Sequence, residues 1–181
     1  MGEKRQARQG ADVLLQEEPL RFQTRKQVGL LGGNFNPVHL AHLVMADQVQ
    51  NQLGLDKVYL MPTYLPPHVD EKKTISSEHR LAMLELAVAD NPCLDIEPIE
   101  LIRKGKSYTY DTMKALKEAN PDTDYYFIIG GDMVEYLPKW HRIDDLLHLV
   151  QFVGIRRPNY PTESTYPIIW VDVPQMAISS T

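Results

Sequence analysis

The residues best suited to chemistry lie together in one segment, which reads Gly-Gly-Asn-Phe-Asn-Pro-Val-His-Leu-Ala-His from Gly32 to His42. Its two glycines allow the backbone to turn tightly and to approach a ligand closely. His39 and His42 are spaced i, i+3, so they share one face of the first turn of a helix. Imidazole N–H groups and the free backbone N–H groups at a helix start both attract phosphate. The segment therefore predicts an anion site at a strand-to-helix junction.

Two other interpretations of this segment are weaker. A glycine turn followed by two incidental histidines would not explain why two glycines, Pro37 and both histidines coincide at one junction. A zinc site would need a third ligand. The sequence nominates none, so we predict no metal-ligating residue. The segment also matches neither the dinucleotide-binding G-x-G-x-x-G fingerprint nor the lysine-containing P-loop.

Short apolar runs alternate with amphipathic stretches from Val28 onward, and these are the elements that must position the segment. We expect strands over 28–32, 57–61, 94–97, 125–129, 151–155 and 168–173, and helices over 39–53, 76–90, 109–119 and 143–149. This alternation predicts an α/β fold: a single domain with a doubly wound, Rossmann-like parallel sheet and helices on both faces. In such sheets ligands bind at the carboxyl ends of the strands, where the histidine segment begins.

The composition excludes several classes of function. The 181 residues suit one domain. Asp and Glu outnumber Lys and Arg by 24 to 19, and this acidic balance argues against nucleic-acid or membrane partners, which require a basic face. No apolar run approaches the roughly 18 residues of a membrane span. Because Cys93 is the lone cysteine and no signal peptide is recognisable, we expect a cytoplasmic protein.

The segment from Gly32 to His42 resembles the G-x-F-x-P-x-H-x-G-H signature of the nucleotidyltransferase superfamily. Asn36 stands where many members have Asp, and Ala41 where most have Gly. Further short motifs occur in the same order as in one branch of this superfamily, at residues 66–68, 75–81, 107–112, 129–132, 137–140, 157–158 and 178–181. Together they make residues 28–181 similar to the bacterial nicotinate-nucleotide adenylyltransferases. The resemblance implies transfer of AMP from ATP to nicotinate mononucleotide, with release of pyrophosphate, in NAD biosynthesis.

The resemblance also implies roles for individual residues. His39 and His42 would be catalytic and would contact the triphosphate of ATP, which Mg²⁺ would accompany. The rest of the ATP site would be Gly32, Gly33, Asn34, Phe35, Gly130, Asp132, Arg157, Ile178, Ser179, Ser180 and Thr181. The acceptor would be bound by Asn36, Lys72, Tyr108, Thr109 and Trp140. An aromatic face suits a flat, cationic pyridinium ring.

Several of these residues also have a plain structural interpretation. Asp132 could cap a helix after Gly131, and Trp140 could be a core residue. Lys72 and its neighbour Lys73 could be a solvated loop. Arg80, on an amphipathic helix, is interpreted as a structural ion-pair partner rather than as a site residue.

Two alternative functions stand beside this hypothesis. One is a sister adenylyl- or cytidylyltransferase with another phosphate acceptor, against which Trp140 and residues 107–112 argue. The other is a non-catalytic nucleotide-binding regulator that kept the fold. The resemblance is compatible with a homo-oligomer.

The two ends of the chain carry expectations of their own. Residues 1–26 are polar and charged without sustained periodicity, so we expect a disordered extension before a nucleotidyltransferase domain over 27–181. The family pattern continues Ser-Ser-Thr-x-Ile-Arg into a last helix, and we expect the present chain to lack that helix.

Overall fold

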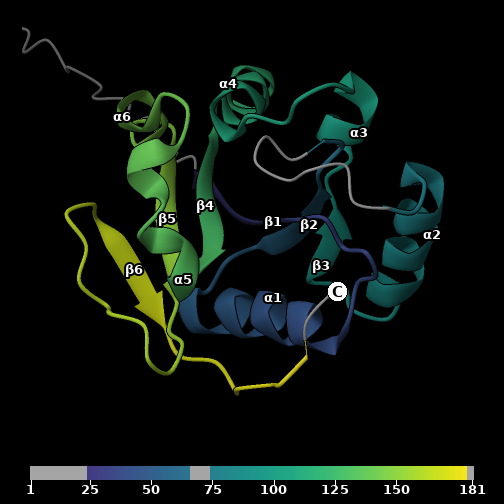
Figure 1. The fold of residues 1–181 in the computed structure, drawn as a ribbon. Coiled ribbons are helices and arrows are strands. Elements are labelled where there is room, and N and C mark those ends of the chain that lie inside the picture. The colour runs from purple at the N-terminus through teal and green to yellow at the C-terminus, as the bar shows by residue number, and fades with distance from the viewer. Residues whose placement is uncertain (1–23, 66–73, 179–181) are drawn as a thin grey trace, which may run out of the picture.

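A computed structural model describes residues 24–65 and 74–178 of the chain. These residues form one six-stranded, all-parallel sheet with the strand order β3-β2-β1-β4-β5-β6 (Figure 1). The strands are β1 (Lys26–Gly33), β2 (Lys57–Pro62), β3 (Leu94–Ile96), β4 (Thr123–Gly130), β5 (Val150–Ile155) and β6 (Ile168–Val171). The predicted doubly wound parallel sheet is confirmed.

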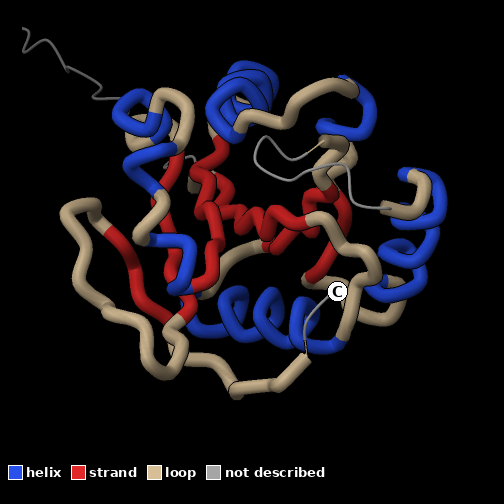
Figure 2. Tube along the Cα trace, viewed as in Figure 1, coloured by secondary structure: helices blue, strands red, loops and turns tan. Residues whose placement is uncertain are grey.

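Helices cover both faces of the sheet (Figure 2). They are α1 (Leu40–Leu53), α2 (Ser77–Val88), α3 (Ile99–Arg103), α4 (Thr109–Ala119), α5 (Gly131–Val134), the 3-10 helix η1 (Leu137–Lys139) and α6 (Ile143–Leu146). Residues of α1 and α2 pack in the core on one face, and residues of α4, α5, η1 and α6 pack in the core on the other. No helix in the described ranges is both long and apolar enough to cross a membrane.

The strand order creates a switch point between β1 and β4. From β1 the chain passes through α1 to β2 on one side, whereas β4 pairs with the other side of β1. Helices that follow the two halves cover opposite faces, so a crevice opens at the carboxyl ends of these two strands. Gly33 and Gly130 are the last residues of β1 and β4, which places both glycines at this crevice.

Two details at the start of the fold differ from the sequence expectation. The first strand begins at Lys26, and the Arg25 guanidinium donates to Asp124 at the start of β4. Residues 1–23 of the expected extension lie outside the described residues. Leu40 is an apolar residue of the helix expected over 39–53, yet it is 56% exposed; the buried residues of α1 are Ala46 and Val49, further along the helix.

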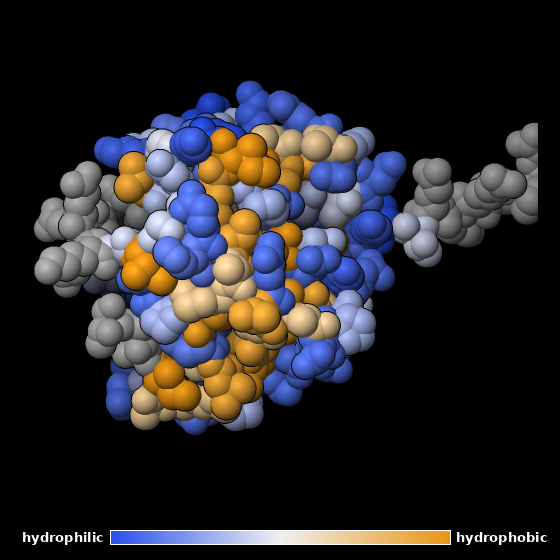
Figure 3. All heavy atoms as spheres, turned by 90° about the vertical axis from the view of Figure 1, so that its right-hand side faces the viewer, coloured by the Kyte–Doolittle hydropathy of each residue, from blue (hydrophilic) through white to orange (hydrophobic). Residues whose placement is uncertain are grey.

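The side of the molecule that carries α2 and α3 has a band of apolar surface between hydrophilic areas (Figure 3). Leu86 of α2 is 80% exposed and Ile102 of α3 is 72% exposed. These two side chains therefore add little to the core of this chain.

Candidate active site

A cavity of about 450 Å³ lies at the carboxyl ends of the strands, at the switch point. It brings together the following residues predicted from the sequence: Gly32, Gly33, Asn34, His42, Tyr108, Thr109, Gly130, Trp140 and Arg157. The rest of its wall was not predicted as part of a site: Leu31, Met45, Met61, Thr63, Glu100, Ser107, Phe127, Ile128, Ile129, Met133 and His141. Residues from β1, β4 and the start of α4 thus meet in one space.

A side chain would crowd its neighbours at the ends of the two central strands. A Cβ atom on Gly33 would lie 3.1 Å from the ring of Phe35, and one on Gly130 would lie 2.5 Å from Oδ1 of Asp132. Neither position has room for a side chain without movement of its neighbours. Both strand ends therefore present bare backbone to the cavity, which lets a ligand approach the main chain closely.

The two histidines form one unit at the start of α1. His39 is the N-cap residue, and its backbone N–H donates to Nδ1 of His42 over 3.2 Å. The two rings stack with their centroids 3.7 Å apart, and the Phe35 ring meets His42 edge-on at 4.9 Å. The prediction that both histidines share one face is confirmed, although only His42 lines the cavity.

The hydrogen bond to Nδ1 fixes the protonation pattern of His42. Burial lowers the pKa of His42 to about 4, and the neighbouring His39 lowers it in the same direction. The ring is therefore neutral at neutral pH, and because Nδ1 accepts, its proton sits on Nε2. His42 is thus an uncharged N–H donor beside the cavity. Nδ1 of His39 is buried and has no partner.

Phe35 and Asn36 support the loop behind the histidines. Phe35 is 1% exposed with φ at +45°, and its ring packs between Gly33 and His42. Oδ1 of Asn36 accepts the backbone N–H of Ile75, just before α2. The structure does not bring either residue into the cavity wall, although the sequence placed both among the ligand-binding residues.

Arg80 of α2 is 1% exposed and ties together the ends of two strands. Its Nη1 donates to the carbonyl oxygens of Asn34 and Thr63, each at 2.8 Å, which follow β1 and β2. Within residues 24–65 and 74–178 no carboxylate forms an ion pair with Arg80, so the expected ion pair is not found in these ranges. Burial lowers the pKa of Arg80. Arg80 instead holds the backbone that follows β1 to the backbone that follows β2, beside the cavity.

Asp132 and Arg157 form a loose pair of charges at the edge of the cavity. Nε of Arg157 lies 3.5 Å from Oδ1 of Asp132, and that buried oxygen has no hydrogen-bond partner. Asp132 is the second residue of α5, whose N-cap is Gly130, so it does not occupy the capping position. Arg157 lines the cavity, whereas Asp132, also predicted for the ATP site, does not, although its Oδ1 lies beside Gly130, which does.

The opposite wall is aromatic. Trp140 packs edge-on against Phe127 and Phe152, with centroids 5.9 Å apart in both pairs, and it also lines the cavity. It is therefore both a core residue and part of the cavity wall. The ring of His141 lies 4.8 Å from that of Tyr108. The signal for His141 in the sequence was its place directly after Trp140.

Some predicted residues are not placed at the cavity. Lys72, Ser179, Ser180 and Thr181 lie outside the described residues. Ile178 is the last described residue, is 46% exposed and does not line the cavity. Among the described ranges there is no cluster of three or more His, Cys, Asp or Glu side chains that could hold a metal ion.

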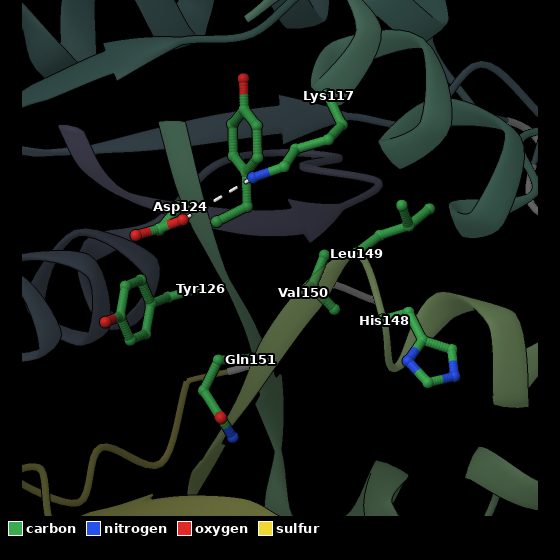
Figure 4. Close-up of a pocket in the computed structure, with 8 residues that line it drawn as sticks. Lys117, Asp124, Tyr126, His148, Leu149, Val150 and Gln151 are labelled. Atoms are coloured by element: carbon green, nitrogen blue, oxygen red, sulfur yellow. Dashed lines mark ion pairs between the residues drawn. The ribbon is translucent and has the colours of Figure 1, made fainter. Parts of the chain in front are cut away.

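A second, smaller hollow of about 260 Å³ lies at the amino ends of β4 and β5 (Figure 4). Lys117 and Asp124 face each other across it at 3.7 Å. Asp124 also accepts from Arg25 and Gln27, at 2.9 and 3.0 Å. Because these groups satisfy one another, this hollow is a structural ion-pair cluster, and the cavity at the carboxyl ends is the candidate active site.

Comparisons with known proteins give a consistent result. Residues 30–181 match the profile of the cytidylyltransferase-like family. The probable nicotinate-nucleotide adenylyltransferase of Streptococcus pneumoniae serotype 4 is 67% identical over 164 residues, 91% of this chain and 78% of the relative. That of Lactococcus lactis is 66% identical over 157 residues, 87% and 80% of the two chains. The solved structure of Plasmodium falciparum nicotinic acid mononucleotide adenylyltransferase complexed with NaAD shares the fold, with a TM-score of 0.71 and 19% identity over 86% of this chain and 81% of that one.

Proposed function

Because the chain belongs to the family of nicotinate-nucleotide adenylyltransferases, we propose that it joins ATP and nicotinate mononucleotide in the cavity at the carboxyl ends of β1 and β4. The products are nicotinate adenine dinucleotide and pyrophosphate, in NAD synthesis. One observation carries the assignment of the site. The cavity joins the phosphate-suited glycine and histidine junction to an aromatic wall that suits a pyridine ring.

The reaction is an in-line attack of the acceptor's 5′-phosphate on the α-phosphorus of ATP, with pyrophosphate as the leaving group. The attacking phosphate is already an anion at neutral pH, so no side chain has to remove a proton. The protein has to hold two negatively charged substrates together and to neutralise charge on the leaving group. The described site contains donors and bare backbone, which are suited to this task.

His42 supplies a donor whose orientation is fixed in advance. The backbone N–H of His39 occupies Nδ1, so Nε2–H is the group left for a phosphate oxygen. The negative charge of a bound triphosphate raises the pKa of a neighbouring imidazole. A neutral donor can therefore become a charged one as negative charge accumulates on the leaving group. Arg157, whose Nε lies 3.5 Å from Asp132 Oδ1, adds a cation to the wall of the same cavity.

The start of α4 supplies the acceptor end. Its N-cap residue, Tyr108, gives no side-chain cap, so backbone N–H groups of the first turn are left for a ligand. Those donors and the helix dipole favour the carboxylate on the pyridine ring. Tyr108 and Trp140 offer flat faces to the ring itself.

Mg²⁺ is proposed as the cation that arrives with ATP. It prefers oxygen ligands and commonly binds through substrate phosphates with few protein ligands. The described residues fit this mode, because Oδ1 of Asp132, beside Gly130, has no hydrogen-bond partner and the described ranges hold no cluster of three or more His, Cys, Asp or Glu side chains. When bound, the ion would neutralise charge on the pyrophosphate.

The test is pyrophosphate release by the purified chain, with chromatography of the dinucleotide product. The chain is incubated with ATP, Mg²⁺ and either nicotinate mononucleotide, nicotinamide mononucleotide, phosphopantetheine or glycerol phosphate. We expect rapid release with nicotinate mononucleotide and none with the last two acceptors. If none of the four acceptors led to pyrophosphate release, an enzymatic role would be contradicted. A preference for phosphopantetheine or glycerol phosphate would contradict the proposed acceptor.

A further inference from the structure

Glu100 is an unusual residue to find in the wall of this cavity. It lies in the five-residue helix α3, and only 4% of it is exposed. Carboxylates are rarely buried without strong partners, because burial penalises the charged form. Oε1 of Glu100 accepts the hydroxyl of Thr112 at 2.9 Å, while Oε2 is buried and has no partner. Nothing in the reaction described above uses this carboxyl group.

The partners of Glu100 belong to the acceptor end of the cavity. Thr112 lies in the first turns of α4, and the Ser107 hydroxyl, directly before Tyr108, is near enough to the Glu100 carboxyl to lower its pKa. Oγ of Ser107 in turn accepts the backbone N–H of Tyr64, in the loop after β2. One buried carboxyl group therefore links α3, the start of α4 and the loop after β2.

The first turn of α4 lacks a side-chain cap, so contacts from neighbouring elements have to hold it in place. Its N-cap residue makes no side-chain cap, so the first turn lacks the usual local anchor. Thr112, which bonds to Glu100, and Ser107, which lies close to its carboxyl group, stand on either side of the two residues between them that line the cavity, Tyr108 and Thr109. A shift of this turn would move the backbone N–H groups that face the acceptor.

We propose that Glu100 is a positioning residue for the acceptor, which holds the first turn of α4 where its N–H groups receive the carboxylate of the pyridine ring. The inference rests on the proposed function. Glu100 acts through Ser107 and Thr112, whereas the glycine and histidine junction that receives ATP does not contact it. Removing the carboxyl group should therefore weaken binding of the acceptor and leave binding of ATP unchanged.

The charge of Glu100 is compatible with an anionic acceptor. An ionised carboxylate behind the helix start would repel the carboxylate of the substrate. Burial raises the pKa of Glu100 and so favours its neutral form, against the opposing effects of Thr112, Ser107 and Arg103. A neutral glutamine of the same size should therefore replace it in function better than alanine.

Glu97 provides a matched control. It is a half-buried carboxyl group on the same connection, burial raises its pKa as well, and Oε1 accepts the backbone N–H of Ile99. It does not line the cavity. Steady-state kinetics would be compared for wild type, Glu100→Ala, Glu100→Gln and Glu97→Ala, with the KM for nicotinate mononucleotide and the KM for ATP measured separately.

We expect Glu100→Ala to raise the KM for nicotinate mononucleotide about tenfold or more and to leave the KM for ATP within about twofold. Glu100→Gln should recover most of the loss, and Glu97→Ala should leave both values unchanged. If Glu100→Ala does not fold, Thr112→Val serves instead, because it removes the hydrogen bond between Thr112 and Glu100 by deleting the donor. It should raise the KM for nicotinate mononucleotide in the same way. An equal rise in both KM values, or no rise in either, would overturn the proposal.

Hydrogen exchange separates this proposal from the proposed function. The amides of residues 109–112 should exchange faster in Glu100→Ala than in wild type or Glu97→Ala, whether or not substrate is turned over. Wild type that forms no dinucleotide would contradict the function and leave this readout valid. An active wild type with unchanged exchange and unchanged KM values in Glu100→Ala would contradict only the role of Glu100.

Discussion

The polar groups at the two ends of the sheet differ in whether they have hydrogen-bond partners within the protein. At the amino ends of the strands, Asp124 pairs with Lys117 (Figure 4) and also accepts from Arg25 and Gln27, and none of these four described side chains has a buried polar atom without a partner. At the carboxyl ends lie all four buried side-chain atoms without a partner in the described ranges. They are His39 Nδ1, Arg80 Nε, Glu100 Oε2 and Asp132 Oδ1.

This difference distinguishes polar groups that hold the strands together from polar groups that can bind substrates. Buried polar atoms in native proteins are nearly always paired, so each unpaired one needs an explanation. The hollow at the amino ends has charge but no unused bonding capacity, which suits a cluster that holds strands together. The cavity at the carboxyl ends is lined by bare glycine backbone, the His42 ring and the Arg157 cation, which suits the binding of substrates. Substitutions at the two ends should therefore have different consequences.

The largest contrast should come from one histidine at each end. His42→Ala removes a donor to the leaving group and should lower kcat about 10²–10³-fold, with the fold intact by circular dichroism. His148→Ala, in the hollow at the amino ends, should leave kcat unchanged. Near-normal turnover by His42→Ala would show that the site is assigned to the wrong residues.

The next contrast concerns two arginines and is measured as stability. Arg80→Ala leaves the carbonyls of Asn34 and Thr63 without their donor and should cost about 3 kcal/mol of unfolding free energy. Arg25 is exposed, so Arg25→Ala should leave the urea midpoint almost unchanged. Equal losses in the two variants would refute the structural role given to Arg80.

Acid should affect the two ends in different pH windows. The pKa of His42 is near 4 in the folded protein and about 6.5 when unfolded, so the unfolded chain binds the proton first and stability falls as pH drops from 6.5 towards 4. Asp124, whose pKa is lowered chiefly by its bond to Arg25, contributes stability that is lost only below its ordinary value of 3.8. Urea unfolding at pH 7, 6 and 5 should therefore show a weaker pH dependence for His42→Gln than for wild type, and an unchanged one for Asp124→Asn.

The smallest effect should come from Asp124→Asn itself. It removes the charge that holds Arg25 and Lys117 but touches nothing at the carboxyl ends. We expect kcat and both KM values within about twofold of wild type at pH 7. A selective change in the KM of one substrate would mean that the amino ends take part in binding.

The junction around Gly32 and His42 could be predicted from the sequence because its signal is local. Glycines, histidine spacing and an adjoining apolar strand all lie within a short stretch of chain. The roles of Arg80 and Glu100 could not be predicted, because their partners come from distant segments. Arg80 bonds to backbone carbonyls, which no residue type reveals, and Glu100 lies in a helix too short for any periodicity.

The central claim is that substrates meet at the carboxyl ends of the strands. It is tested most directly by the two-dimensional ¹⁵N–¹H NMR spectrum of the wild-type protein during addition of nicotinate adenine dinucleotide, the expected product. We predict that the amide signals of Gly33, Thr109 and Gly130 shift while those of Asp124 and Gln151 stay in place. Shifts confined to Asp124 and Gln151 would contradict the account.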